Sequence, residues 1–264
     1  MKKILSIIIF IIIYAFIING EYMNKFKSIP TFKLENLKRY QNYKKNNISI
    51  EEIVRNVNLN LDYGFYNNIM DALNIDTYLV LVNKNYRLDE SYVPKTLELM
   101  DYKYTAGKEL YADKTAKKFF EMMSTDASTM NLNIKAMSIY RSYNYQKELY
   151  EKYLLTDDEK TVDTYSARPG HSEHQTGLSF DLFNVAKPYT EFGNTNEYKW
   201  IKLNAHKYGF IIRYTKQNEY ITGYKEEPWH IRFVGINAAK YIYENNITLE
   251  EYLLNKNSLF CYES

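Results

Sequence analysis

Short stretches in which hydrophobic and polar residues alternate recur from residue 134 onward, as expected of strands that bury one face. The stretch 178–182 is the clearest, because its apolar side chains fall on one side and Ser179 and Asp181 on the other. Apolar runs of strand length add to these stretches. The predicted strands are residues 78–82, 134–140, 178–182, 210–214 and 229–233.

Apolar residues at helical spacing separate several of these strands and predict helices. The predicted helices begin near residue 50, span 114–130, follow Ser142 through Leu149, span 196–208 and 237–244, and begin again after residue 248. Ser49 with Glu52, and Thr248 with Glu251, have the spacing of a capping box, and Gly209 is expected to end a helix. Because helices and strands mix without a regular βαβ rhythm, we predict an α+β fold with a small, mainly antiparallel sheet flanked by helices.

The first twenty residues have the pattern of a targeting segment. Lys2 and Lys3 precede an apolar run at residues 4–18, the order found in secretory signals. The run is shorter than the roughly 20 residues of a spanning helix, yet no A-x-A type of cleavage site follows it. We expect a signal peptide or, with slight preference, a signal-anchor at residues 1–20. The lysines that follow the run argue against an anchor that leaves the rest of the chain outside, since cationic flanks usually stay in the cytoplasm.

Beyond this segment we expect a mostly helical spacer at residues 21–76 and the main domain at residues 77–264. The N-terminal segment implies that the protein lies outside the cytoplasm, anchored to the membrane or secreted.

Composition excludes several classes of function. A formal net charge of +2 over 264 residues is too small for a protein that binds nucleic acid through a basic surface. Cys261 is the single cysteine, which excludes an intramolecular disulfide and a metal site built from several thiolates. Its place near the C-terminus also argues against a cysteine nucleophile, because a reactive thiolate needs an enclosed, electropositive setting. We expect a monomer.

The chemistry of the chain concentrates in two stretches that contain histidine, residues 171–181 and 226–232. His174, Asp181 and His230 together would supply two imidazoles and one carboxylate, a usual shell for a catalytic Zn²⁺ with a fourth position open. Asp181 lies between apolar residues of a short strand, where a carboxylate is costly to bury unless a cation faces it. An ordinary hydrogen-bonded pair of His174 and Asp181 is the alternative for the first stretch alone.

A glutamate near the second histidine is a candidate general base. Glu227 lies three residues before His230, so its carboxylate could take a proton from an attacking water while the histidine binds metal. In a regular strand the two side chains would point to opposite faces, but Pro228 indicates a local bend that would bring Glu227 round. Glu226 is the competing candidate and is better explained as a solvated loop carboxylate.

Three other side chains are candidates for a role at the site. Arg141 follows a predicted strand, where its guanidinium could hold a substrate carboxylate or stabilise an oxyanion; a structural ion pair is the alternative. His206 lies within a predicted helix and is best explained as a helix-surface histidine. His171 is a possible substitute for His174 as a ligand and otherwise has no assigned role.

The motif Ser172-x-His174-x-x-Gly177-x-Ser179-x-Asp181, followed by Glu227-Pro-Trp-His230, resembles the VanY-type zinc D-alanyl-D-alanine carboxypeptidases, relatives of lysostaphin with the hedgehog/DD-peptidase fold. The resemblance spans residues 77–256 and includes Tyr140-Arg-Ser-Tyr143 and Asn204-Ala-His-Lys-Tyr-Gly-Phe210. One departure is visible, because Ser179 stands where the family usually has alanine. The change is small and leaves the expected ligands in place.

The resemblance implies a function and roles for individual residues. It implies one Zn²⁺ per chain bound by His174, Asp181 and His230, with Glu227 as the catalytic base. It implies Arg141, Gln146 and Ser172 as contacts to the terminal carboxylate and scissile carbonyl of the substrate. The implied activity removes the terminal D-alanine from peptidoglycan stem peptides at the cell wall of a Gram-positive type of bacterium.

Several other functions remain open on the sequence. An L,D-carboxypeptidase acting on tetrapeptide stems, or an endopeptidase of the same family, would carry the same motifs. Two histidines and one carboxylate could also hold Fe(II) in an oxygenase, where Glu227 would have no required part. A wall-binding module without catalysis is disfavoured, because the expected ligands and base are all present.

Overall fold

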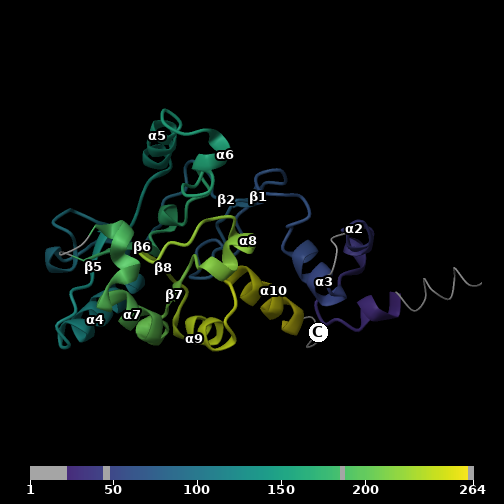
Figure 1. Cartoon of the computed structure of the whole chain (residues 1–264). Helices are drawn as coiled ribbons and strands as arrows, with labels where there is room; N and C mark the ends of the chain where they lie inside the picture. Colours follow the sequence, from purple (N-terminus) through teal and green to yellow (C-terminus); the bar gives the residue numbers. More distant parts are fainter. Residues whose placement is uncertain (1–22, 44–47, 185–187, 261–264) are drawn as a thin grey trace, which may run out of the picture. The chain divides into compact units, whose positions relative to one another are not determined.

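A computed structural model describes residues 23–43, 48–184 and 188–260 (Figure 1). Residues 65–252 form one compact unit, and the described residues before 65 form another together with residues 253–260. The predicted targeting segment at residues 1–20 and Cys261 lie outside the described residues. Within the described ranges, no helix combines the length and the apolar character that crossing a membrane requires. The expected boundary near residue 76 stays a prediction.

The N-terminal unit is helical and has its own small core. Its elements are η1 (Leu34–Asn36), α2 (Leu37–Asn42) and α3 (Ile50–Asn58). The capping box predicted for Ser49 and Glu52 is confirmed, because each side chain accepts a hydrogen bond from the backbone N–H of the other residue. Aromatic and β-branched side chains fill the interior, which contains Phe26, Ile29, Tyr40, Tyr43, Val54 and Val57.

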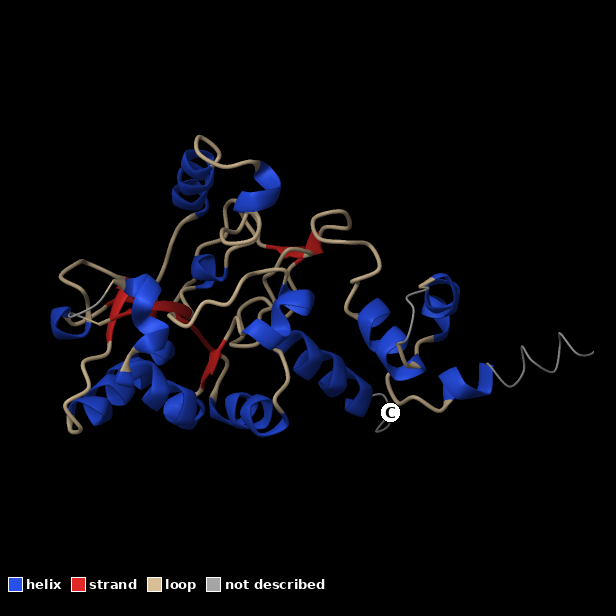
Figure 2. Ribbon diagram, viewed as in Figure 1, coloured by secondary structure: helices blue, strands red, loops and turns tan. Residues whose placement is uncertain are grey.

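The larger unit is built on a four-stranded antiparallel sheet in the order β5-β6-β8-β7 (Figure 2). Its strands are β5 (Lys135–Ser138), β6 (Ser179–Phe183), β7 (Phe210–Ile212) and β8 (His230–Phe233). Two smaller sheets pair β1 (Met70–Asp71) with β2 (Tyr86–Arg87) and β3 (Leu97–Leu99) with β4 (Tyr111–Asp113). Of these only β1 and β2 are parallel. The predicted α+β fold with a small, mainly antiparallel sheet is confirmed.

Helices occur where the sequence predicts them after residue 113: α4 (Lys114–Ser128), α5 (Tyr143–Tyr153), α7 (Asn196–Asn204), α9 (Ile236–Asn245) and α10 (Leu249–Phe260). Two short helices, α6 (Glu159–Val162) and α8 (Glu219–Thr222), were not predicted. The predicted helix 196–208 finishes as a 3₁₀ turn, η5 (Ala205–Tyr208), and Gly209 ends it in the left-handed conformation. The capping box at Thr248 and Glu251 forms at the start of α10.

One face of the sheet is apolar and packs on α4. Phe120 of α4 stacks on Phe180 with ring centroids 4.7 Å apart, and Phe180 meets Phe210 of β7 edge to face at 5.4 Å. All three rings are fully buried. The opposite face contains the polar residues of β6 and β8. Because successive strand residues point to opposite faces, Asp181 and His230 lie on this polar face and not in the apolar core.

The predicted strand at residues 78–82 is wrong. The segment makes only an isolated bridge at Leu81; Tyr78 and Leu79 lie in a turn, and the buried Val80 and Val82 belong to no helix or strand. Its backbone carbonyls have a side-chain partner instead of a neighbouring strand. Nη2 of Arg232 donates to the carbonyl oxygens of Tyr78 at 3.2 Å and Val80 at 2.8 Å. A long-range side-chain contact of this kind leaves no trace in local hydrophobic periodicity.

Gly177 makes the turn that joins η3 (Glu173–Thr176) to β6. Its φ of +68° is in the left-handed region, and an added Cβ would lie 2.8 Å from Leu97 Cδ2 and 3.1 Å from the Asp113 nitrogen. Glycine is therefore required both by the backbone conformation and by the close approach of β3 and β4.

This geometry predicts that Gly177→Ala destabilises the protein more than Gly107→Ala does. Gly107 has a similar φ of +77° but nothing within 4 Å of an added Cβ, so it isolates the backbone cost. We expect a loss of about 1–2 kcal/mol for Gly107→Ala and a further loss of roughly 1–3 kcal/mol for Gly177→Ala from the clash. Urea unfolding of both variants measures the difference; equal losses would contradict the steric argument.

Candidate metal centre

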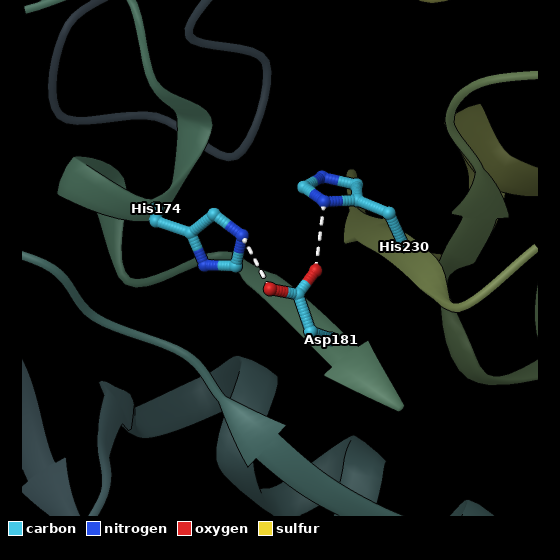
Figure 3. A group of neighbouring side chains, drawn as sticks. All are labelled: His174, Asp181 and His230. Atoms are coloured by element: carbon cyan, nitrogen blue, oxygen red, sulfur yellow. Dashed lines mark hydrogen bonds and ion pairs between the residues drawn. The ribbon is translucent and has the colours of Figure 1, made fainter. Parts of the chain in front are cut away.

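Asp181 and His230 meet because their strands are neighbours in the sheet. They are 49 positions apart in sequence, yet the antiparallel register of β6 and β8 places them directly opposite each other. Residues paired in this way have their Cβ atoms about 5 Å apart on the same face. The Oδ1 atom of Asp181 lies 3.1 Å from Nδ1 of His230 (Figure 3). The strand pairing alone therefore brings two predicted ligands together.

His174 reaches the same point from η3. Its carbonyl oxygen accepts a hydrogen bond from the Arg141 backbone N–H at 3.1 Å, which ties η3 to the segment that follows β5. Nε2 of its imidazole lies 3.2 Å from Oδ2 of Asp181. Figure 3 shows the Asp181 carboxylate between the two imidazoles, with one oxygen toward each. One ligand atom from each of the three residues lies within 4.8 Å of the others.

The hydrogen bonds of His174 indicate that this cluster suits a cation. Nδ1 of His174 donates to the carbonyl oxygen of Ile139 at 2.5 Å, so the neutral ring has an unprotonated Nε2. That nitrogen is buried and has no hydrogen-bond partner in the described part of the chain. Its lone pair faces a carboxylate oxygen, an unfavourable contact that a metal ion between the two atoms would make favourable. The residues present therefore fit Zn²⁺.

Burial and charge support the neutral state of His174. Burial, followed by the nearby Arg141 guanidinium, lowers the pKa of His174 to about 4. Burial would raise the pKa of Asp181, but its contacts with the two histidines hold that pKa well below the ordinary value. Burial also opposes the charged form of His230, yet the carboxylates of Asp181 and Glu173 outweigh it and raise its pKa to about 9. The cluster thus presents one ionised carboxylate to any cation.

Glu227 lies beside the cluster in a turn, as its neighbour Pro228 predicted. The carbonyl oxygen of Glu227 accepts a hydrogen bond from the His230 N–H at 3.1 Å, and its Oε2 lies 3.7 Å from Nδ1 of His230. Its side chain is 13% exposed, and burial raises its pKa to about 7. A carboxyl that titrates near neutral pH suits proton transfer. Glu226, the competing candidate, is exposed.

Arg141 points into the site and is held by Gln146. Its Nη2 donates to Oδ2 of Asp181 at 3.4 Å, and its Nη1 donates to Oε1 of Gln146 at 3.0 Å. The Arg141 Nε is buried and has no hydrogen-bond partner in the described residues. Gln146 is buried and its Nε2 donates to the Ala167 carbonyl oxygen at 2.8 Å, so both ends of its amide are in use. Gln146 therefore orients Arg141 in this structure.

The remaining predicted positions are spread around the site. Ser172 is buried, and its Oγ accepts a hydrogen bond from the His174 N–H at the start of η3. His171 lies outside the metal cluster, where its Nδ1 is 2.8 Å from the Asn83 carbonyl oxygen. His206 stacks on Tyr243 with ring centroids 3.8 Å apart, so it packs between helices. A direct contact of Ser172 or Gln146 with substrate stays a prediction.

Sequence reasoning missed a buried ionic network behind His230. Its members are Glu173, Arg213, Arg232 and Glu250, all of them buried. Oε2 of Glu173 lies 3.3 Å from Nε2 of His230. One signal was available: Arg232 shares the polar face of its predicted strand with His230, and a buried arginine requires an acidic partner.

The family model for VanY, D-alanyl-D-alanine carboxypeptidase, matches residues 109–236. YodJ of Bacillus subtilis (strain 168) is 38% identical over 210 residues, which cover 75% of this chain and 77% of that protein. The chain belongs to the VanY family. The predicted resemblance to this family is therefore confirmed, and the cluster described above lies within the matched residues.

Solved structures of VanY-family and related enzymes have the same fold. The LD-carboxypeptidase LdcB is 40% identical with a TM-score of 0.62, over 66% of this chain and 84% of that one. A variant of the vancomycin-resistance D,D-pentapeptidase VanY in complex with Zn(II) is 29% identical with a TM-score of 0.56, over 67% of this chain and 98% of that one.

The raised pKa of Glu227 predicts that Glu227→Gln stabilises the metal-free protein above neutral pH. A carboxyl with a raised folded-state pKa lowers stability as the pH rises from 4.5 through about 7, because only the unfolded chain ionises freely. At pH 8 we expect a gain on the order of 3 kcal/mol, at about 1.4 kcal/mol per pH unit of that interval. Urea unfolding in excess chelator measures it. Near pH 4.5 the gain should almost vanish.

Glu226→Gln is the matched control, since that neighbouring carboxyl is exposed and should give no comparable gain. A Glu227→Gln variant that is less stable than the wild type at pH 8 would contradict the prediction.

Proposed function

We propose that this protein is a zinc-dependent D-Ala-D-Ala carboxypeptidase that removes the terminal D-alanine from peptidoglycan stem peptides. The observation that supports it best is the meeting of His174, Asp181 and His230, with an unprotonated Nε2 on His174 that has no hydrogen-bond donor among the described residues. The solved VanY variant holds Zn(II), and the matched family model is that of a D-alanyl-D-alanine carboxypeptidase. We propose one Zn²⁺ per chain.

The residues at the site divide the work of amide hydrolysis among them. His174, Asp181 and His230 would hold Zn²⁺, which would supply a Lewis acid that polarises the scissile carbonyl and makes water more acidic. Glu227 takes the proton from the attacking water and returns it to the leaving amine of the D-amino acid. Arg141 stabilises the negative charge that develops on the carbonyl oxygen or holds the terminal carboxylate. Its orientation by Gln146 reduces the reorganisation that either contact needs.

An L,D-carboxypeptidase is the second candidate. Among the structures described above, the LD-carboxypeptidase LdcB has the higher identity and TM-score. Its site would use the same ligands and base, because both activities hydrolyse an amide next to a free carboxylate. An endopeptidase would not need to bind a free terminal carboxylate, so Arg141 would serve there only to stabilise the carbonyl oxygen.

We also propose that the enzyme acts outside the cytoplasm, where mature peptidoglycan lies. The cationic and then apolar order of residues 2–18 supports export, by cleavage or as a signal-anchor. Expression of the full chain with fractionation of membranes and medium would locate it; a wholly cytoplasmic protein would contradict this part of the proposal.

Zinc removal should abolish stem-peptide hydrolysis, and Glu227→Gln should slow it strongly. Because Glu227 is not among the proposed ligands, its variant should still bind Zn²⁺ while kcat falls by about 10² to 10⁴.

Mass spectrometry of pentapeptide and tetrapeptide stems, digested side by side, distinguishes the two candidate activities by which stem loses a single residue. Wild-type protein loaded with zinc that leaves both stems intact would overturn the proposed function. Iron with oxygen-dependent turnover would point to an oxygenase.

The pH dependence of hydrolysis should report Glu227. The base acts only when ionised, so kcat/KM should rise with pH and then level off. Burial raises the pKa of Glu227 to about 7, and a bound cation lowers it, so the apparent pKa should lie between 4.5 and about 7. Steady-state rates from pH 4 to 9 at constant free zinc measure it. A rising limb centred above pH 8 would indicate a different base.

A further inference from the structure

A carboxylate outside the predicted ligand set contacts the second histidine of the site. Glu173 precedes His174 in η3, and its side chain has no exposed surface. Its Oε2 lies 3.3 Å from Nε2 of His230, the ring nitrogen that points away from Asp181. His230 is therefore held between two carboxylates, one at each nitrogen.

Two buried arginines fix the orientation of this carboxylate. Nε of Arg213 and Nη1 of Arg232 each donate to Oε1 of Glu173 at 2.8 Å. Both guanidinium groups are fully buried. Because Oε1 is occupied by these donors, Oε2 is the oxygen left for His230, and the Ser179 hydroxyl donates to it at 3.3 Å. The two positive charges also favour the ionised form of Glu173.

The two histidines of the site have opposite hydrogen-bonding patterns. His174 donates from Nδ1 to the Ile139 carbonyl oxygen and leaves Nε2 toward Asp181. His230 has its acceptor at Nε2, so its Nδ1 is the nitrogen left toward Asp181. In each ring the partner at the far nitrogen decides which nitrogen keeps its proton when a metal ion binds to the other.

We propose that Glu173 is a positioning residue that assigns Nδ1 of His230 to the metal by accepting the Nε2 proton. The inference rests on the proposed function, because it requires that the cluster of His174, Asp181 and His230 binds Zn²⁺. Glu173 acts through His230 and does not contact substrate. Its charge makes His230 a more basic ligand, and its two arginines prevent the carboxylate from turning into the metal site itself.

Glu250 offers a matched control. Its two carboxylate oxygens accept from Nη1 and Nη2 of Arg213 at 2.9 and 2.7 Å, and it is buried like Glu173. Among the described residues its carboxylate accepts hydrogen bonds from Arg213 and Asn83 and makes none with His230. Glu250→Gln therefore removes a buried charge from the same network without changing the acceptor at His230.

The test compares the zinc affinity of Glu173→Gln and Glu250→Gln by competition with a chromophoric chelator. Both variants should lower the melting temperature, since each weakens a buried ion pair. Only Glu173→Gln should lower zinc affinity, by about 10-fold to 100-fold, as is usual when the partner of a metal-binding histidine is lost. The visible absorption of the Co²⁺-substituted protein should change in Glu173→Gln and stay as in the wild type in Glu250→Gln.

The possible results separate this inference from the proposed function. If the wild type binds zinc and both variants bind it equally well, Glu173 is only structural and the inference is wrong. If the wild type binds no zinc, the proposed function fails and the inference fails with it.

If Glu173→Gln does not fold, the wild type alone decides the question. Long-range proton–nitrogen NMR of the zinc-loaded protein, which has only four histidines, should show His230 protonated at Nε2 and not at Nδ1. The opposite tautomer would overturn the proposal.

Discussion

The pairing of β6 with β8 is the constraint on which the site depends. Its register sets Asp181 opposite His230, and the alternation of strand residues then places Ser179 and Arg232 on the same face. Phe180 and Ile231, one position along, must face the core. A slip of one residue would exchange the two faces and would place the carboxylate and imidazole in the aromatic core against α4. The packing of Phe120 on Phe180 therefore protects the geometry of the metal cluster as well as the stability of the fold.

Burying the polar face of the sheet costs desolvation free energy, which hydrogen bonds and ion pairs with other segments of the unit offset. Ser179, His230 and Arg232 are buried there, with Asp181 nearly so, and each needs a partner. Glu173 and Arg213 supply partners from η3 and from the end of β7, while the carbonyls of residues 78 and 80 accept from Arg232. In the segment 78–82, two backbone carbonyls therefore bind Arg232 and do not pair with a neighbouring strand. Structural ion pairs and the candidate catalytic groups form one continuous system in which His230 belongs to both.

Two kinds of carboxylate lie close together in this system and differ in their surroundings. Glu173 faces two arginines, so it is held ionised, whereas Glu227 is buried beside Asp181, and its pKa rises to about 7. The difference separates their chemistry. A permanently charged acceptor suits the orientation of a ligand, and a carboxyl that gains and loses a proton near neutral pH suits a base.

Local patterns along the chain predicted the central strands, most of the longer helices and the chemical groups of the site. Alternation located β6 and β8, capping residues located α3 and α10, and the spacing of His174, Asp181, Glu227 and His230 named the groups that the fold brings together. These signals come from residues close together in the chain, so they can be read from the sequence. Only the tertiary structure shows which nitrogen of each histidine faces Asp181, that the Gln146 amide contacts Arg141, and that the carbonyls of residues 78 and 80 accept from Arg232 instead of pairing in a sheet. Each of these depends on contacts between segments far apart in the chain, where periodicity and propensity carry no information.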